Sequence, residues 1–423
     1  MWNFSTFLCA FIVIVVFCKV DATPRRLSRQ KQPIGRSTSF VVHITQEEIV
    51  RKTGYFVEEH FVTTSDGYIL SIHRIFGGPK SQPKLGKPLV LLIHGMVASS
   101  DVWVMRGPGK DLVYLLSDEG FDVWLLNVRG NTYSRQHIRM SPKSPEFWRF
   151  SWHENGVYDL PATVDYVLAR TRQIKVTLIG HSMGTTAIYV FLSVRPEYNE
   201  KVDLVVSLAP IAIFTHQYRG PALTIGLKVG KAALSSFRRN GVLELLSHGD
   251  IGPQLVSAFC SRPGAKTICR ETIFLISGSV DREQFDDALI PSLLEHYPAG
   301  TSLDTVEHYR QNLVNQSFRE FDFGRATNYL RYGNFTPPEY PLKKITAPVI
   351  LYYGLNDPLS HPLDVQALAR VLPNLVASKL VPWPNFNHFD FVISKDSKIL
   401  LYDDVISVVK KYKEAQRRIR THR

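Results

Sequence analysis

Residues 176–186 read VTLIGHSMGTT, and this stretch decides the fold. An apolar run typical of a buried strand ends at Gly180, and the apolar segment 185–194 that follows predicts a helix. Between them Ser182 stands in the pattern Gly-x-Ser-x-Gly. A serine on a tight strand-to-helix turn needs glycine neighbours, because larger side chains would collide with the strand and the helix. Such a turn lifts the hydroxyl above the sheet, so we interpret Ser182 as a candidate nucleophile.

Strands and helices alternate on both sides of this turn. Short apolar runs predict strands at 87–95, 121–127, 176–180, 202–210, 348–354 and 378–383, and helical patterns lie at 110–120, 157–170 and 185–194. An alternating hairpin pattern surrounds Ser65-Asp66-Gly67. Regular alternation of this kind predicts an α/β protein with a mostly parallel sheet of about eight strands and helices on both faces.

The chain divides into five expected segments. Residues 7–18, FLCAFIVIVVFC, are too short to span a membrane and predict a signal peptide over 1–22, with an uncleaved anchor as the alternative. A basic, flexible lead is expected over 23–43. Strands and helices are predicted to alternate over 44–214 and again over 341–423, but not over 215–340. We therefore expect 215–340 to be one insertion that folds over the edge of the sheet.

Composition narrows the class of protein. The hydrophobic content of 44% predicts a sizeable core, and 50 Lys+Arg against 38 Asp+Glu give a net charge of +12. Much of the excess lies near the two ends of the chain, and no basic stripe with interleaved aromatic residues indicates nucleic acid. No stable protein partner is inferred.

The cysteines and the sequons are typical of a protein of the secretory pathway. We expect the protein to be secreted, with the lysosomal lumen as the alternative location. Once the signal peptide is removed, Cys260 and Cys269 remain; they form one short disulfide or stay as two free buried thiols. Asn315 and Asn334 stand in sequons and are candidate glycosylation sites.

A serine nucleophile needs a base, and the base needs an acid to fix its tautomer. In a fold of this kind the partners follow the serine in the order acid, then histidine, each on a loop after a later strand. Asp357 follows the apolar run 348–354, and His388 follows the run 378–383. Asp364 and His361 are rivals, but they lie where the pattern predicts a helix. Asp390 is interpreted as a neighbour that steadies the histidine loop.

Two backbone N–H groups should stabilise the charge that develops on the substrate. Met183 follows the nucleophile directly, and Met96 lies in the loop after the strand 87–95. His94 is interpreted as a hydrogen-bonded anchor of that loop, with a role as catalytic base as the alternative. No metal or cofactor is expected, because WHENG lacks the second histidine of a zinc helix and GPGKD is too short for a phosphate loop.

With these residues in place, the chain resembles the acid lipase family of animals, the gastric and lysosomal lipases, from about residue 44 to the last helix. The likeness rests on TSDGYILSIHRI, HGMVASSDVW, GNTYSRQH, FWRFSWHENGVYDLPATVDY, GHSMGTT, HYPAGTS and NHFDF. The resemblance implies the α/β-hydrolase fold with a mainly helical cap and a movable lid over 215–340. It also implies Ser182, Asp357 and His388 as a triad, an oxyanion hole from Met96 and Met183, and a disulfide between Cys260 and Cys269.

The same resemblance implies hydrolysis of triacylglycerols or cholesteryl esters at a lipid droplet or emulsion surface, without a cofactor. Family members commonly carry Gln at the position of Met183 and Leu at that of Met96, and Trp-Leu-Ala where Pro358-Leu-Ser follows the acid here. These departures remove no catalytic group but change the polarity of the cleft. The alternatives are a carboxylesterase or thioesterase on soluble esters, and a catalytically silent lipid carrier on the same fold.

Overall fold

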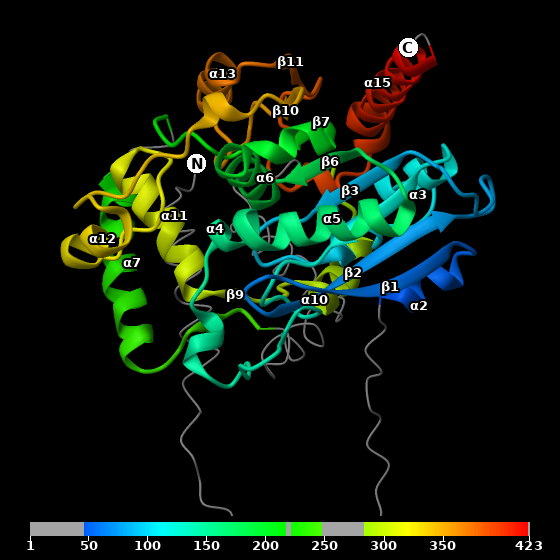
Figure 1. Ribbon diagram of the computed structural model, residues 1–423. Coiled ribbons are helices and arrows are strands. Elements are labelled where there is room, and N and C mark those ends of the chain that lie inside the picture. Colours follow the sequence, from blue (N-terminus) through cyan, green and yellow to red (C-terminus); the bar gives the residue numbers. More distant parts are fainter. Residues whose placement is uncertain (1–45, 217–220, 248–282, 422–423) are drawn as a thin grey trace, which may run out of the picture.

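One mixed β-sheet forms the centre of the structure (Figure 1), a computed structural model that describes residues 46–216, 221–247 and 283–421. The strand order is β1-β2-β4-β3-β6-β7-β10-β11, with β5 paired to β2. The six consecutive strands β4, β3, β6, β7, β10 and β11 pair in parallel, and β1, β2 and β5 add antiparallel neighbours at one side. The bounds are β1 Phe56–Thr63, β2 Tyr68–Gly77, β3 Leu89–Ile93, β4 Asp122–Leu126, β5 Gln136–His137, β6 Val176–His181, β7 Val202–Leu208, β10 Val349–Tyr353 and β11 Leu375–Leu380. The predicted α/β class and the hairpin are confirmed.

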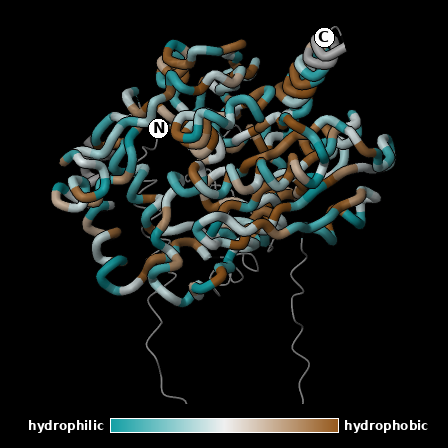
Figure 2. Tube along the Cα trace, viewed as in Figure 1, coloured by the Kyte–Doolittle hydropathy of each residue, from teal (hydrophilic) through white to brown (hydrophobic). Residues whose placement is uncertain are grey.

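Helices cover both faces of the sheet. Neighbouring residues of β3 point to opposite faces, so Leu91 packs with α5 and α6 while Leu92 packs with α3 and α15. In Figure 2 the hydrophobic residues accordingly concentrate in the centre of the molecule. The helices of this part are α2 Gln46–Lys52, α3 Leu112–Asp118, α4 Trp152–Glu154, α5 Leu160–Thr171, α6 Met183–Val194, α13 Pro362–Val371, α14 Asp390–Ile393 and α15 Asp403–Thr421. Short 3-10 turns are η1 Ser100–Trp103, η2 Pro145–Trp148, η4 Pro196–Lys201, η5 Asp287–Leu289 and η6 Leu342–Lys344, and π turns are η3 Asn155–Asp159 and η7 Lys398–Tyr402.

The described part of 215–340 lies mostly to one side of the sheet, at the left of Figure 1. It contains α7 Pro221–Arg239, α10 Ile290–His296, α11 Leu303–Asn315 and α12 Arg325–Tyr332. It also contains two strands of two residues each, β8 Glu244–Leu245 and β9 Thr301–Ser302, which pair with one another. We call this part the cap. No strand is predicted here from the sequence, because a strand of two residues shows no periodicity.

The cap packs on the core through buried polar and aromatic contacts. The imidazole of His308 on α11 stacks on Trp152 with ring centroids 3.6 Å apart, and its Nδ1 contacts the hydroxyl of Ser151 at 2.9 Å. Tyr309 donates a hydrogen bond of 2.9 Å to Thr186 on α6. Since α6 begins directly after Ser182, the cap is in contact with the helix that carries the candidate nucleophile.

Several of the predicted features lie outside the described residues or on the surface. The signal peptide over 1–22, the lead over 23–43 and the pair Cys260 and Cys269 lie outside the described residues. Both sequon asparagines are exposed, and Asn334 accepts a hydrogen bond of 3.2 Å from the backbone of Thr336. Of the helices in the described ranges, none combines the length and the apolar character required to cross a membrane.

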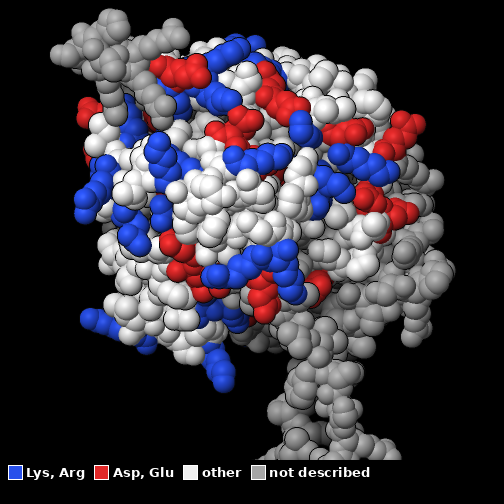
Figure 3. Space-filling model, turned by 90° about the vertical axis from the view of Figure 1, so that its right-hand side faces the viewer, with Lys and Arg blue, Asp and Glu red and all other residues white. Residues whose placement is uncertain are grey.

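Figure 3 shows the face at the right-hand side of Figure 1, where basic and acidic side chains are interspersed. Ion pairs between exposed side chains include Lys410 with Glu119 at 2.5 Å and Lys379 with Asp404 at 2.7 Å. Such alternation leaves no large field of a single sign on that face.

Candidate active site

Ser182 occupies a strained turn between β6 and α6. Its backbone has φ 53° and ψ −120°, a region that residues other than glycine rarely adopt. The turn is held on both sides, because the Ser182 N–H donates to Leu208 of β7 at 3.0 Å and the Ser182 carbonyl accepts from Thr185 at 2.8 Å. The predicted strand–serine–helix turn is therefore present, with the helix beginning at Met183.

The flanking glycines are required by close approach of the backbone. A Cβ added to Gly184 would lie 2.3 Å from the carbonyl oxygen of Ile93 on β3. A Cβ on Gly180 would lie 2.9 Å from the backbone of Gly184. A Cβ on Gly95 would lie 3.3 Å from the Cβ of Ser182. The close approaches at Gly180 and Gly184 explain the spacing of the motif, and the one at Gly95 places the loop after β3 beside the candidate nucleophile.

Three loops bring the predicted serine, histidine and aspartate together. His388 Nε2 lies 2.7 Å from Ser182 Oγ, and His388 Nδ1 lies 2.9 Å from Asp357 Oδ2. The hydroxyl and the imidazole lie on segments 206 residues apart in the chain. Relative exposures are 8% for Ser182, 3% for His388 and 2% for Asp357. The geometry is that of a nucleophile, a base and an orienting acid.

Asp357 is held as a carboxylate. Burial alone would raise the pKa of Asp357, but the neighbouring His388 and the N–H groups of Leu359 and Ser360 lower it below its ordinary value. These two N–H groups donate to Oδ1 at 2.9 and 2.8 Å. An ionised Asp357 accepts a hydrogen bond from the Nδ1–H of His388, so in the neutral imidazole the Nε2 atom carries no proton and can take that of Ser182.

The rival residues have other partners. Asp364 accepts hydrogen bonds from the N–H groups of Thr215 and His216, at 3.1 and 2.9 Å, and so fixes the start of the cap on α13. His361 accepts from the backbone of Leu363 at the beginning of α13. Asp390 accepts the Asn387 N–H at 2.8 Å, which supports the interpretation that it steadies the histidine loop.

His94 orients the peptide that carries the Met96 N–H. Its Nδ1 donates to the Gly95 carbonyl at 2.8 Å, and its Nε2 accepts from Asn131 at 3.2 Å. Because carbonyl and N–H point in opposite directions across a trans peptide, this bond turns the Met96 N–H away from His94. Burial lowers the pKa of His94 to about 4, so the ring is neutral near pH 7. Met183, at the start of α6, has no helical acceptor for its own N–H.

The acid and histidine loops also touch one another directly. A Cβ added to Gly354 would lie 2.2 Å from the Phe386 carbonyl oxygen, and Asn356 donates to that oxygen at 3.2 Å. His181 Nε2 lies 2.9 Å from the His388 carbonyl, and burial together with the nearby His388 lowers the pKa of His181 to about 3. The neutral ring donates this bond and ties the serine turn to the histidine loop. The only sequence signal for this role of His181 is its place inside the motif.

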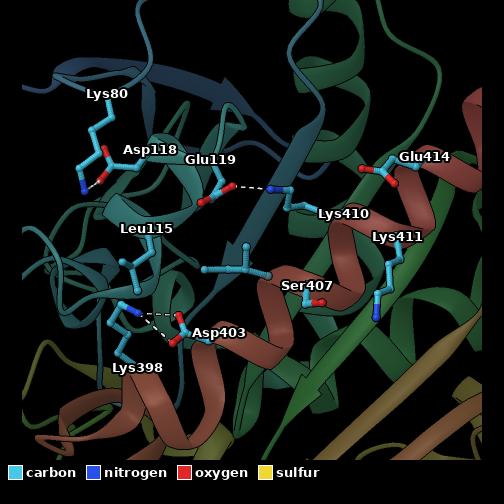
Figure 4. Close-up of a pocket in the computed structure, with 11 residues that line it drawn as sticks. Lys80, Leu115, Asp118, Glu119, Lys398, Asp403, Ser407, Lys410, Lys411 and Glu414 are labelled. Atoms are coloured by element: carbon cyan, nitrogen blue, oxygen red, sulfur yellow. Dashed lines mark hydrogen bonds and ion pairs between the residues drawn. The ribbon is translucent and has the colours of Figure 1, made fainter.

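A charged groove of about 550 Å³ lies between α3 and α15 (Figure 4). Its ion pairs include Lys410 with Glu119 and Lys398 with Asp403. None of its lining residues comes from the loops that carry the serine, the aspartate and the histidine. The groove is therefore separate from the candidate active site. Within the described ranges, no three His, Cys, Asp or Glu side chains are grouped so that they could hold a metal ion.

Known proteins resemble the chain over most of its length. The model described as "Partial alpha/beta-hydrolase lipase region" matches residues 46–107, and "alpha/beta hydrolase fold" matches 88–235. Lipase 1 of Drosophila melanogaster is 37% identical over 93% of this chain and 85% of its own. Gastric triacylglycerol lipase of Bos taurus is 36% identical over 86% of this chain and 90% of its own.

Solved structures share the fold at low identity. A monoglyceride lipase variant from Saccharomyces cerevisiae has a TM-score of 0.52 and 16% identity, over 86% of this chain and 97% of that one. A putative lipase from Sulfolobus solfataricus has a TM-score of 0.53 and 14% identity, over 81% of this chain and 90% of that one.

Fold, site and relatives together define a serine hydrolase of the α/β-hydrolase class that acts on ester bonds. Within this class, the chain belongs to the animal acid lipase family, to which the gastric lipases also belong. The resemblance inferred from the sequence motifs is thereby confirmed.

Proposed function

We propose that the protein hydrolyses the ester bonds of neutral lipids, triacylglycerols or cholesteryl esters, with Ser182 as the nucleophile. The observation that carries the proposal is the continuous chain of contacts from Ser182 Oγ through the His388 imidazole to the Asp357 carboxylate. Gastric triacylglycerol lipases, at 34 to 36% identity, support the class of substrate.

In the first half of the reaction, Ser182 Oγ attacks the ester carbonyl as its proton passes to His388 Nε2. The C–O bond to the alcohol then breaks, and His388 gives the proton to the leaving oxygen. In the second half, His388 takes a proton from water, the hydroxide attacks the acyl-serine, and the fatty acid leaves as Ser182 regains its proton. Asp357 keeps the imidazole in the required tautomer and stabilises the imidazolium.

The backbone N–H groups of Met96 and Met183 are proposed as the oxyanion hole. Their place supports this role: Met183 begins the helix after the nucleophile, and Met96 follows the glycine that approaches Ser182. One donor of this kind contributes about 2.7–4 kcal/mol to transition-state stabilisation.

The proposed partner is the surface of a lipid droplet or emulsion, and the proposed compartment is the secretory pathway with release from the cell. The apolar segment 7–18 and the exposed sequons at Asn315 and Asn334 support this location. A disulfide between Cys260 and Cys269 and a lid within 215–340 remain parts of the proposal.

Substitution Ser182→Ala tests the mechanism. We expect hydrolysis of emulsified trioleoylglycerol to fall by about 10⁶-fold, because the acyl-enzyme at Ser182 can no longer form and only substrate binding and the oxyanion hole still act. Ser193→Ala is the matched control, since Ser193 lies buried on the same helix and its hydroxyl donates only to Val190, at 3.2 Å, among the described residues. Full activity of Ser182→Ala would refute the mechanism.

Two further measurements separate the alternatives. The rate on one short-chain ester, measured below and above its solubility limit, should rise once droplets form; a flat response would favour an esterase for soluble substrates. A fluorophosphonate probe should form an adduct at Ser182, whereas no adduct would favour a silent lipid carrier.

A further inference from the structure

The loop after β3 contains a strained residue next to the proposed oxyanion donor. Val97 follows Met96 directly and has φ 54°. A β-branched side chain is a genuine outlier in this left-handed region, and such a conformation persists only where the surroundings hold it. A rotation at Val97 would also move the Met96 N–H, so the groups that hold Val97 in place also set the position of this donor.

The cap supplies one of these contacts. Ala299 donates its N–H to the Val97 carbonyl at 2.7 Å, and the Ala299 carbonyl accepts from the Thr132 N–H at 2.9 Å. Ala299 is itself 1% exposed. The cap segment 296–299 therefore lies between two core loops, and one of its N–H groups fixes the strained residue.

An ion pair supplies a second contact, a few residues farther along the same loop. His296, the last residue of α10, places Nδ1 3.1 Å from Oδ2 of Asp101 in η1. Tyr133 donates to the other oxygen of Asp101 at 2.8 Å. The side chains of His296 and Asp101 are 2% and 4% exposed, so the pair is shielded from water.

We propose that His296 is a positioning residue for hydrolysis: together with the Ala299 N–H, its bond to Asp101 clamps the loop 95–101 and so aims the Met96 N–H at the developing oxyanion. The inference rests on the proposed function, since it requires Met96 to be an oxyanion donor. It assigns to the cap a role in the chemistry. His296 acts through Asp101 and touches no substrate.

The surroundings of the clamp favour a charged pair. Burial alone would lower the pKa of His296, but the hydrogen bond and the charge of Asp101 raise it, and Glu295 adds to the rise. Burial alone would raise the pKa of Asp101, but His296, Tyr133 and Ser99 lower it. A further titratable group near the pair is His94, which is neutral near pH 7.

The experiment compares His296→Gln with His308→Gln. Both histidines are buried on the cap and bond to the core, but His308 contacts Ser151 and Arg319, away from the loop 95–101. For each variant, kcat and KM are measured on a soluble ester. The concentration of active sites is determined by titration with a fluorophosphonate. We expect His296→Gln to lower kcat by about 10- to 100-fold with KM changed less than about 3-fold, because a displaced donor is lost in the transition state. His308→Gln should keep kcat within about 3-fold of the wild type.

The inhibition constant Ki of an alkyl trifluoromethyl ketone is a second readout, one that a general loss of stability would not change. Ser182 adds to this ketone to form a hemiketal oxyanion, so its Ki should rise in His296→Gln by the same factor as kcat falls, and should not rise in His308→Gln. Tyr133→Phe, which keeps the ring and removes one bond to Asp101, should lower kcat by roughly 3- to 10-fold even if His296→Gln does not fold.

Equal kcat and Ki in His296→Gln, His308→Gln and the wild type would overturn the clamp. If Ser182→Ala is inactive in the same assay, the proposed function holds even when the clamp is refuted. An active Ser182→Ala would refute both the clamp and the proposed function.

Discussion

Asp357 and Asp364 lie close together in the chain, both are buried, and only Asp357 contacts the imidazole of His388. The difference lies in their partners. Asp364 accepts from the start of the cap, whereas Asp357 accepts from His388 and from two N–H groups of its own loop. At the scale of single residues, partners and not burial decide which carboxylate can act in catalysis.

Asp357→Asn should therefore lower kcat by about 10⁴-fold with the fold intact, because the amide leaves His388 in the wrong tautomer to accept the Ser182 proton. The prediction is checked by measuring kcat on a soluble ester. The amount of folded protein used to calculate kcat is determined by circular dichroism. Asp364→Asn is the control, and it should lower the stability but leave kcat nearly unchanged. If both variants lost the same activity, the assignment of the acid would be wrong.

The serine, the aspartate and the histidine could be predicted because each follows an apolar run, and such runs become neighbouring parallel strands. His181, Asp101 and His296 could not be assigned in this way. Their interactions depend on burial and on partners far away in the chain: His296 and Asp101 are 195 residues apart, and neither stands in a pattern with a known chemical role. The structure alone shows these contacts.

At the scale of elements, the strands buried on both faces were predicted close to their place, whereas the edge strand β11 was predicted with shifted bounds. All five residues of β3 and of β4 are buried, so each reads as a continuous apolar run. Edge strand β11 pairs only with β10, and burial alternates along it. Its sequence LVASKL mixes polar and apolar residues, so the prediction of a strand at 378–383 was displaced toward the following apolar residues.

A buried charge cluster joins three elements of the core. Arg129, 2% exposed, lies after β4 and contacts Asp159 of the π turn η3 at 2.7 Å and Asp66 of the hairpin turn at 2.6 Å. Its guanidinium also lies 4.0 Å from the ring centroid of Tyr68. The cluster fixes α5 and the hairpin against the sheet.

Asp159→Ala should lower the free energy of unfolding by about 3 kcal/mol, since it leaves a buried guanidinium with one carboxylate instead of two. Urea unfolding followed by tryptophan fluorescence measures the change. Lys398→Ala, which breaks the exposed pair with Asp403, should cost no more than about 1 kcal/mol. Equal losses in the two variants would contradict the role of the cluster.

At the scale of the whole molecule, the cap and the core share buried contacts at α11 and at the segment 296–302. Ser302 donates to the Phe150 carbonyl, His308 stacks on Trp152, and His296 pairs with Asp101. No local sequence pattern could reveal this docking, because each contact joins a cap residue to a core residue far away in the chain. Of the three contacts, the pair of His296 with Asp101 is the one that contains a histidine whose pKa is raised above its ordinary value.

Docking of the cap should therefore depend on pH. The pKa of His296 is raised above 6.5, so its contribution is complete below pH 6.5 and is lost as the pH rises through the folded-state value. The pKa of Asp101 is lowered below 3.8, so its contribution is present above pH 3.8 and is lost as the pH falls through the folded-state value. The difference in unfolding free energy between wild type and His296→Gln should be largest between these limits and shrink above neutrality. A pH-independent difference from urea titrations would contradict the charged pair.

The contact of Gly354 with the carbonyl of Phe386 has a consequence for how such a molecule diversifies. The acid loop and the histidine loop cannot shift apart without breaking backbone packing, so the spacing of the reacting groups is inherited as a unit with the sheet. We therefore expect variation in which ester is accepted to arise in the cap, whose residues can change while the reaction itself stays the same.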